Sequence, residues 1–252
     1  MKTRGLPLGI QKNILQCILI LIITVFISCK PTLENVDLSE NGSGILLAFD
    51  DYFPDSWREH FDLFDKYNAR VTFFVLSEYP DSFCFEAKQR GHEIAYHTIN
   101  HLRLPEINDE QFVKETTSAI KAFNEKGLEL HAFAYPYGDW ESWMHERLLE
   151  HYEVVRGFDR FFHIYKKESL GRGYISSMSI DNLCYKTDES FRNRIIYAVY
   201  NAKKNANMII TLTTHQISNA DWGITKERLE FLLKTCNDVN LKFFRYQDIS
   251  SF

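Results

Sequence analysis

Residues 91–101 read GHEIAYHTINH and join a strand-like segment to two histidines. Residues 94–96 are apolar and predict a strand, and His97 and His101 follow it four positions apart, in a turn or a single helical coil. Side chains at i and i+4 share one face of such a coil, and neutral imidazole suits zinc and its first-row neighbours. Because the chain has nine histidines, a pair at this spacing also arises by chance, so the pair alone does not establish a metal site.

Strand-like and helix-like segments alternate on both sides of this stretch. Continuous apolar runs such as GILLAF (44–49) and MIITLT (208–213) predict strands that are buried on both faces. Strict alternation predicts parallel strands with right-handed crossovers, so we expect an α/β fold, a distorted (β/α)7-type barrel, in a single catalytic domain over 44–252. The expected strands span 44–49, 71–76, 94–97, 128–135, 153–158, 174–181, 208–213 and 241–246, and the expected helices 57–67, 83–90, 108–126, 141–151, 189–205 and 225–236.

Reactive side chains follow several of the expected strands. Asp50 and Asp51 follow the first strand, the histidine pair follows the third, and His215 follows the MIITLT run. In parallel α/β architecture the carboxyl ends of the strands open onto one rim, where residues far apart in sequence meet. Each group also has a structural explanation, since an aspartate pair after a strand is commonly a turn or a helix cap. Their shared position at strand ends favours a joint site.

Four segments in order resemble the polysaccharide deacetylase family, the NodB-homology domains of carbohydrate esterase family 4. They are AFDD (48–51), GHEIAYHTINH (91–101), FAYPYG (133–138) and TLTTH (211–215). The resemblance runs from about Gly44 to the C-terminus, and the histidine block is its most specific part.

The resemblance implies a divalent metal held by Asp51, His97 and His101. The ion is expected to be Zn²⁺ first, with Co²⁺ or Ni²⁺ as alternatives. The residue types fit this role, since two imidazoles and one carboxylate leave open coordination positions for water and a carbonyl oxygen.

The resemblance also implies catalytic and substrate-binding groups around the metal. Asp50 would be the catalytic base, His215 the catalytic acid, and Tyr137 the donor of a backbone N–H to an oxyanion hole. Pro136, Tyr137 and Trp222 are expected to contact the glycan, Trp222 by stacking on a sugar ring, although packing explains this tryptophan equally well.

One family position is not filled. Many members carry an arginine in the third block that pairs with the base, and this position is Ala134 here. Residues 174–181, where a later arginine could stand, have none, and Arg172 lies just ahead of them. The group that orients Asp50 is therefore not identified from the sequence.

The N-terminus has the pattern of a bacterial export signal. Basic residues precede the apolar segment 14–28, and Cys29 follows the small Ser28. This resembles a lipobox, although Phe26 stands where leucine is usual, so we expect a lipoprotein-type signal peptide over 1–29, a lipidated Cys29 and a polar tether over 30–43. The alternative is an uncleaved anchor, but about 15 apolar residues fall short of the roughly 20 that a span needs.

Composition narrows the remaining function classes. The chain has 252 residues, 45% hydrophobic and 25% charged, with a net charge of -5, which is typical of one ordinary globular domain. It has no basic stripe, so we expect no nucleic-acid partner. Cys84, Cys184 and Cys236 match no zinc spacing and allow at most one disulfide.

The prediction is a metal-dependent hydrolase that removes acetyl groups, in the first place N-acetyl groups, from a cell-envelope or extracellular polysaccharide. The lipid anchor would hold it on the extracytoplasmic face of a bacterial membrane. Two alternatives stay open: an O-acetyl carbohydrate esterase on the same site, and a catalytically silent glycan-binding lipoprotein that keeps the metal for structure.

Overall fold

A computed structural model describes residues 41–159 and 163–252. The expected signal peptide, Cys29 and the tether up to residue 40 lie outside the described residues. The last tether residues are joined to the domain: the Asn41 side-chain amide donates to the Lys203 carbonyl and the Ser43 hydroxyl to the Ala202 carbonyl, both at 2.8 Å. The described part of the domain therefore begins at Asn41, before the expected Gly44.

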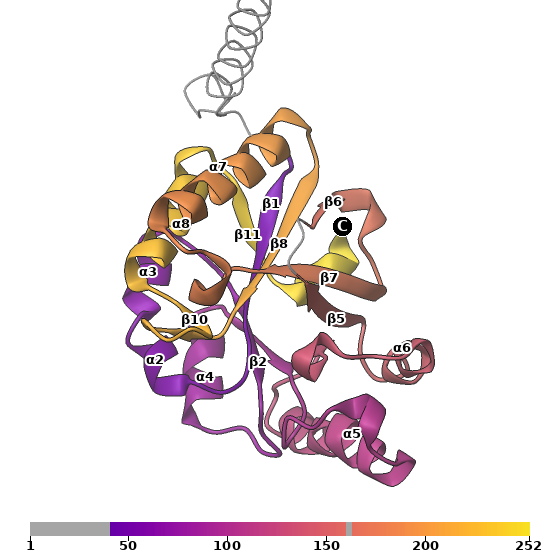
Figure 1. The fold of residues 1–252 in the computed structure, drawn as a ribbon. Coiled ribbons are helices and arrows are strands. Elements are labelled where there is room, and N and C mark those ends of the chain that lie inside the picture. The colour runs from indigo at the N-terminus through magenta and orange to yellow at the C-terminus, as the bar shows by residue number, and fades with distance from the viewer. Residues whose placement is uncertain (1–40, 160–162) are drawn as a thin grey trace, which may run out of the picture. The chain divides into compact units, whose positions relative to one another are not determined.

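Seven parallel strands close into a barrel, as the sequence predicts (Figure 1). β1 pairs with β2 on one side and with β8 on the other, and this second pairing closes the ring. The barrel strands, in spatial order, are β1 (Gly44–Phe49), β2 (Thr72–Val75), β3 (Glu93–Tyr96), β4 (Ala132–Ala134), β5 (Val154–Asp159), β7 (Gly173–Ser179) and β8 (Met208–Thr214).

Two further strands distort the barrel. β11 (Lys242–Phe244) runs parallel to the first half of β1, so β2 reaches β1 only at Ala48 and Phe49. β6 (Ile164–Lys166) runs antiparallel to the first half of β8. The prediction of strictly alternating strands and helices is therefore wrong between β5 and β7, where the described connection contains this edge strand and no crossover helix.

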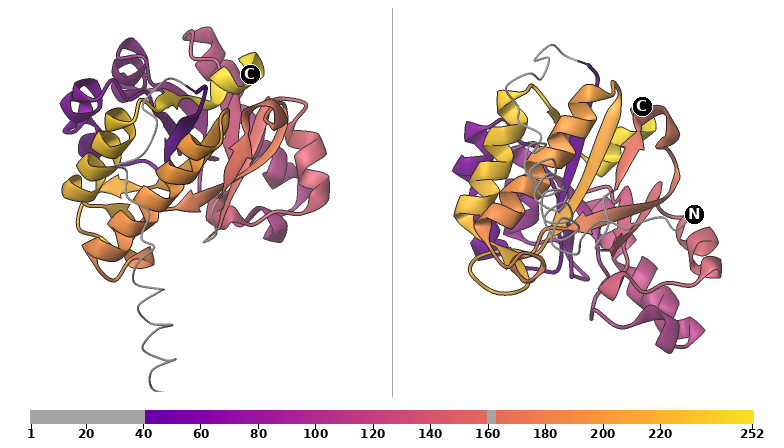
Figure 2. Two further views of the ribbon diagram at one scale, coloured as in Figure 1. Left: turned by 90° about the horizontal axis from the view of Figure 1, so that it is seen from above. Right: turned by 45° about the horizontal axis from the view of Figure 1, so that its top comes forward.

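The helices lie around the barrel, and α7 and α8 lie side by side along it (Figures 1 and 2). The expected helix over 57–67 is two short helices, whereas the helices expected from 108 and 225 begin there: the Asn108 and Thr225 side chains cap them, each accepting a hydrogen bond from the backbone N–H three residues on. The helices are α2 (Pro54–Arg58), α3 (Phe61–Lys66), α4 (Ser82–Gln89), α5 (Asp109–Glu125), α6 (Ser142–Leu148), α7 (Asp188–Lys204) and α8 (Lys226–Asp238).

Shorter elements complete the described chain. They are the 3-10 helices η2 (Leu104–Glu106), η3 (Pro136–Gly138), η4 (Lys167–Ser169), η5 (Asn182–Cys184) and η6 (Tyr246–Ser251), and the paired strands β9 (Gln216–Ile217) and β10 (Gly223–Ile224). No helix within these described ranges combines the length and apolar character needed to cross a bilayer. The three cysteines of the domain are free thiols.

Both faces of the barrel strands are buried, which explains their continuous apolar sequences. In β1, Ile45 and Leu47 belong to the large core beneath the helices, whereas Leu46 and Ala48 belong to the smaller core inside the barrel. Successive side chains of a strand alternate between faces, so each apolar run supplies both cores. The strand ends are consequently fixed on a rigid framework, and the loops beyond them carry the polar residues.

Candidate metal centre and active site

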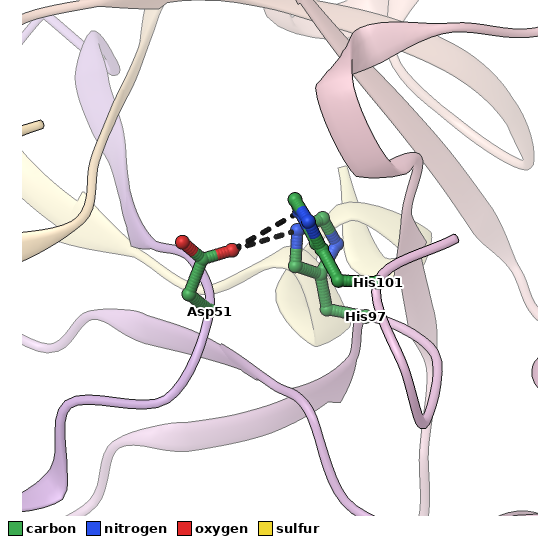
Figure 3. Close-up of side chains that lie close together, drawn as sticks. All are labelled: Asp51, His97 and His101. Carbon is green, nitrogen blue, oxygen red and sulfur yellow. Dashed lines mark ion pairs between the residues drawn. The ribbon is translucent and has the colours of Figure 1, made fainter. Parts of the chain in front are cut away.

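Asp51, His97 and His101 converge at the carboxyl ends of β1 and β3 (Figure 3). Asp51 Oδ1 lies 3.4 Å from His97 Nε2 and 3.2 Å from His101 Nε2, and one ligand atom from each residue lies within 4.8 Å of the others. Within the described chain this carboxylate oxygen is buried and makes no hydrogen bond. Two imidazole nitrogens and one carboxylate oxygen facing one another form a donor set that fits a divalent cation.

Electrostatics favour the ligand forms of Asp51 and His101. Burial raises the pKa of Asp51, but the imidazoles of His97, His215 and His101 outweigh it and lower this pKa below the ordinary value. Burial and the neighbouring His97 lower the pKa of His101. A carboxylate beside a neutral imidazole is the protonation state that metal binding requires.

A turn, rather than a helical face, brings the two histidines together. Residues 97–101 are not helical, and Thr98 and His101 have positive φ of 73° and 54°. The His101 N–H donates to the Thr98 hydroxyl at 3.1 Å, which closes the turn. The expectation of a common site is correct, but the helical alternative for this coil is wrong, because two left-handed residues reverse the chain here.

Groups behind the turn hold it in place. His97 Nδ1 lies 2.8 Å from the Ala134 carbonyl, so this nitrogen carries the proton and Nε2 presents its lone pair to the triad. Glu115 of α5 is buried and accepts from the backbone N–H groups of Ile99 and Asn100 at 3.1 and 2.9 Å, and from the Asn100 side chain at 2.6 Å. The ligand loop is therefore anchored to a helix.

Backbone strain gathers at this site. Seven non-glycine residues in the described ranges have positive φ, and three of them are asparagines, which tolerate it. The other four are Asp51, Thr98, His101 and Tyr137. Strained backbone persists where surrounding structure enforces it, and it clusters at functional sites.

Asp50 is held by an arginine that sequence reasoning missed. Its Oδ2 accepts a hydrogen bond from Arg156 Nη2 at 2.6 Å, and the two side chains are 1% and 0% exposed. Arg156 comes from β5, across the barrel, and its guanidinium lies 4.8 Å from the Phe74 ring. Arg156 thus supplies the positive charge that Ala134 and residues 174–181 lack. The available signal was one charged residue inside the apolar run VVRGF (154–158).

His215 has a carboxylate partner, Asp181, that was also missed. His215 Nδ1 lies 3.1 and 3.0 Å from the two Asp181 oxygens, which leaves Nε2 for the pocket. Burial alone would lower the pKa of His215, but Asp181, with the charges of Asp50 and Asp51, raises it to about 9. The signal for Asp181 was its place just after a strand, like Asp50.

The groups share one pocket of about 230 Å³. Its lining residues are Asp50, Asp51, His97, His101, Tyr137, Phe158, His215 and Trp222. Trp222 is 53% exposed, with its ring edge-on to His215, and Tyr137 is 45% exposed. Pro136 is buried and does not line the pocket, so its expected glycan contact is not supported. Phe158 is a lining residue that the sequence did not indicate.

Comparison with known proteins confirms the family resemblance. Residues 38–151 match the family model described as polysaccharide deacetylase. A curated relative, the bifunctional xylanase/deacetylase of Pseudobutyrivibrio xylanivorans, is 29% identical over 117 residues, which are 44% of this chain and 19% of that protein. The chain spans only 19% and 38% of the lengths of the two curated relatives it matches.

Solved structures share the fold at low identity. The peptidoglycan deacetylase PdaC of Bacillus subtilis aligns with a TM-score of 0.60 and 16% identity, covering 86% of this chain and 93% of that one. A family 4 acetyl xylan esterase from Clostridium thermocellum, solved with a cobalt ion, aligns with a TM-score of 0.57 and 17% identity, covering 82% and 90%. The (β/α)7 barrel expected from the sequence is thereby confirmed.

Proposed function

We propose, from the premise that residues 38–151 match the polysaccharide deacetylase family, that this chain is a metal-dependent hydrolase that removes acetyl groups from a carbohydrate. One observation carries the proposal. Asp51, His97 and His101 converge in the same pocket as a buried carboxylate, Asp50, and a histidine paired with a carboxylate, His215.

The triad would hold the metal through His97 Nε2, His101 Nε2 and Asp51 Oδ1. Zn²⁺ suits these donors, and Co²⁺ or Ni²⁺ would also accept them. Such an ion supplies Lewis-acid chemistry, polarising the acetyl carbonyl and lowering the pKa of water.

Asp50 would act as the base towards the attacking water. Its Oδ2 is held by Arg156, and its Oδ1 has no hydrogen-bond partner in the described chain. An oriented carboxylate with one free oxygen on the pocket can accept a proton during attack. The backbone N–H of Tyr137 would donate to the oxygen that gains negative charge.

His215 would act as the acid towards the leaving group. Asp181 fixes its Nδ1 and favours the imidazolium, so Nε2 can donate a proton to a departing amine. An amine is a poor leaving group and needs this proton more than an alcohol does. This pairing supports N-acetyl sugars as the substrate class. The O-acetyl alternative is kept because one structural neighbour is named an acetyl xylan esterase.

A catalytically silent glycan-binding role was raised because the arginine of the third block is missing. Arg156 now accounts for the charge beside Asp50, which removes that reason. The test is acetate release by the full chain in detergent from an N-acetylglucosamine oligomer and an acetylated xylan, each with zinc, cobalt and nickel. Asp50→Asn serves as the inactive, metal-binding control. Failure to release acetate from either glycan with metal bound would rule the enzyme out.

Export and lipid anchoring at Cys29 complete the proposal, placing the domain on the extracytoplasmic face of a bacterial membrane. Support comes from the sequence pattern of residues 1–29 alone. Expressed in a bacterium, the wild-type chain should fractionate with membranes and carry a lipidated N-terminal cysteine by mass spectrometry. Cys29→Ala should lose the lipid, and an unlipidated wild-type chain would refute the anchor.

A further inference from the structure

Tyr137 has a strained backbone in a turn that two backbone hydrogen bonds close, from the Gly138 N–H to the Tyr135 carbonyl and from the Asp139 N–H to the Pro136 carbonyl. Its φ and ψ are 60° and 0°, in the left-handed region that a tyrosine rarely adopts. Its side chain is 45% exposed, so core packing does not hold the ring. Under the proposed function the backbone N–H of this residue must keep a fixed direction, so neighbouring groups have to hold it.

Two side chains from the metal-ligand loop contact the Tyr137 ring. The His101 ring centroid lies 4.4 Å from that of Tyr137, with the planes at 53°. The Arg103 guanidinium carbon lies 4.2 Å from the centre of the same ring, well within the range of a cation–π contact. The ligand loop and the loop after β4 therefore meet at this tyrosine.

Arg103 also binds the chain just beyond Tyr137. Its Nη1 forms an ion pair with Asp139, two residues further on. A planar guanidinium can stack on a ring with its face and bind a carboxylate with its edge, which a lysine ammonium cannot do. Arg103 thus holds the strained segment at two points, the ring of Tyr137 and the carboxylate of Asp139.

We propose that Arg103 is a positioning residue that fixes the direction of the Tyr137 backbone N–H. The inference rests on the proposed function, in which this N–H donates to the oxyanion. Arg103 acts through Tyr137 and Asp139 and does not touch the reacting atoms. It couples the loop that supplies His101 to the loop that supplies the donor.

The chain offers a matched control. Arg147 lies over the Phe112 ring at 4.8 Å and forms an ion pair with Asp109, the same two kinds of contact. The Arg103 and Arg147 side chains are 45% and 35% exposed, so either should be replaceable without unfolding the domain. Arg147 does not line the pocket.

The test compares Arg103→Met, Arg103→Lys and Arg147→Met in the full chain. Losing a whole oxyanion donor costs about 10²–10³ in kcat, so releasing one should cost less, roughly ten- to a hundredfold. Arg103→Met should therefore lower kcat by that factor with KM within about twofold and zinc content unchanged. Arg103→Lys should recover part of kcat, and Arg147→Met should match the wild type.

Hydrogen exchange tests the inference without turnover. Backbone amides of 137–139 should exchange faster in Arg103→Met than in the wild type or Arg147→Met. The proposal would be overturned if Arg103→Met left the exchange of these amides unchanged or altered KM alone. It would also be overturned if Arg147→Met lowered kcat as much as Arg103→Met does. If the wild-type chain releases no acetate, the proposed function fails while the exchange result still decides whether Arg103 holds this segment.

Discussion

The Arg156–Asp50 pair shows how one buried charge depends on another. Both side chains are almost fully buried, so each has lost its water and relies on its partner. Arg156→Met should lower the free energy of unfolding by about 3–5 kcal/mol, since it leaves an uncompensated carboxylate in the barrel. Adding Asp50→Asn should recover part of that loss. Urea denaturation of the single and the double variant measures both effects. An Arg156→Met protein as stable as the wild type would contradict the buried pair.

His215 gives a pH-dependent prediction for the metal-free protein. Its pKa is raised to about 9, above the ordinary 6.5, so the folded state binds this proton more tightly than the unfolded state does. The resulting stability is fully present below pH 6.5 and is lost as the pH rises towards 9. A histidine NMR titration should show a midpoint near 9 that falls in Asp181→Asn. A midpoint at or below 6.5 in the wild type would refute the Asp181 effect.

At the scale of elements, α5 holds the loop that supplies two ligands. Glu115→Ala would remove three hydrogen bonds that hold Ile99 and Asn100, which lie between the two histidines. Because the histidines would then be less well placed, the variant should bind zinc about 10–100-fold more weakly. Competition with a chelator measures this affinity. Thr117→Ala is the control, because the hydroxyl of this half-buried residue of the same helix donates to the Val113 carbonyl within it and not to the ligand loop. Equal affinities for the two variants would show that Glu115 does not hold the loop.

At the scale of the whole molecule, the metal should join separate parts of the barrel. Its ligands follow β1 and β3, and unfolding would separate them. Zinc at 100 times its Kd should stabilise the native state by about 2.7 kcal/mol, because only the folded chain assembles the site. The Tm should rise with zinc and fall with EDTA in the wild type. In His97→Ala the Tm should no longer change with zinc. A wild-type Tm that does not change with zinc would contradict a metal site in the folded protein.

Local sequence patterns were enough for the barrel, and the resemblance to the deacetylase family indicated the three candidate ligands. Buried strands such as β1 read as apolar runs, the helices expected from 108 and 225 begin there, and Asp51 and His97 lie within two residues of strand ends. The edge strand β6 was not predicted. It has only three residues, too few for an alternation of apolar and polar side chains that would distinguish a strand from a loop.

Sequence by itself determined the class of fold, which depends on short apolar runs, and the likeness to deacetylases, which implied the three candidate metal ligands. Only the tertiary structure decided the partners of the proposed catalytic residues, Asp50 and His215. Arg156 of β5 meets Asp50 across the barrel, and Asp181 after β7 meets His215 after the neighbouring strand β8, at sequence separations of 106 and 34. Closure of the barrel places β5 opposite β1 and brings residues that are far apart in the sequence together. No short sequence pattern indicates which of these residues will meet.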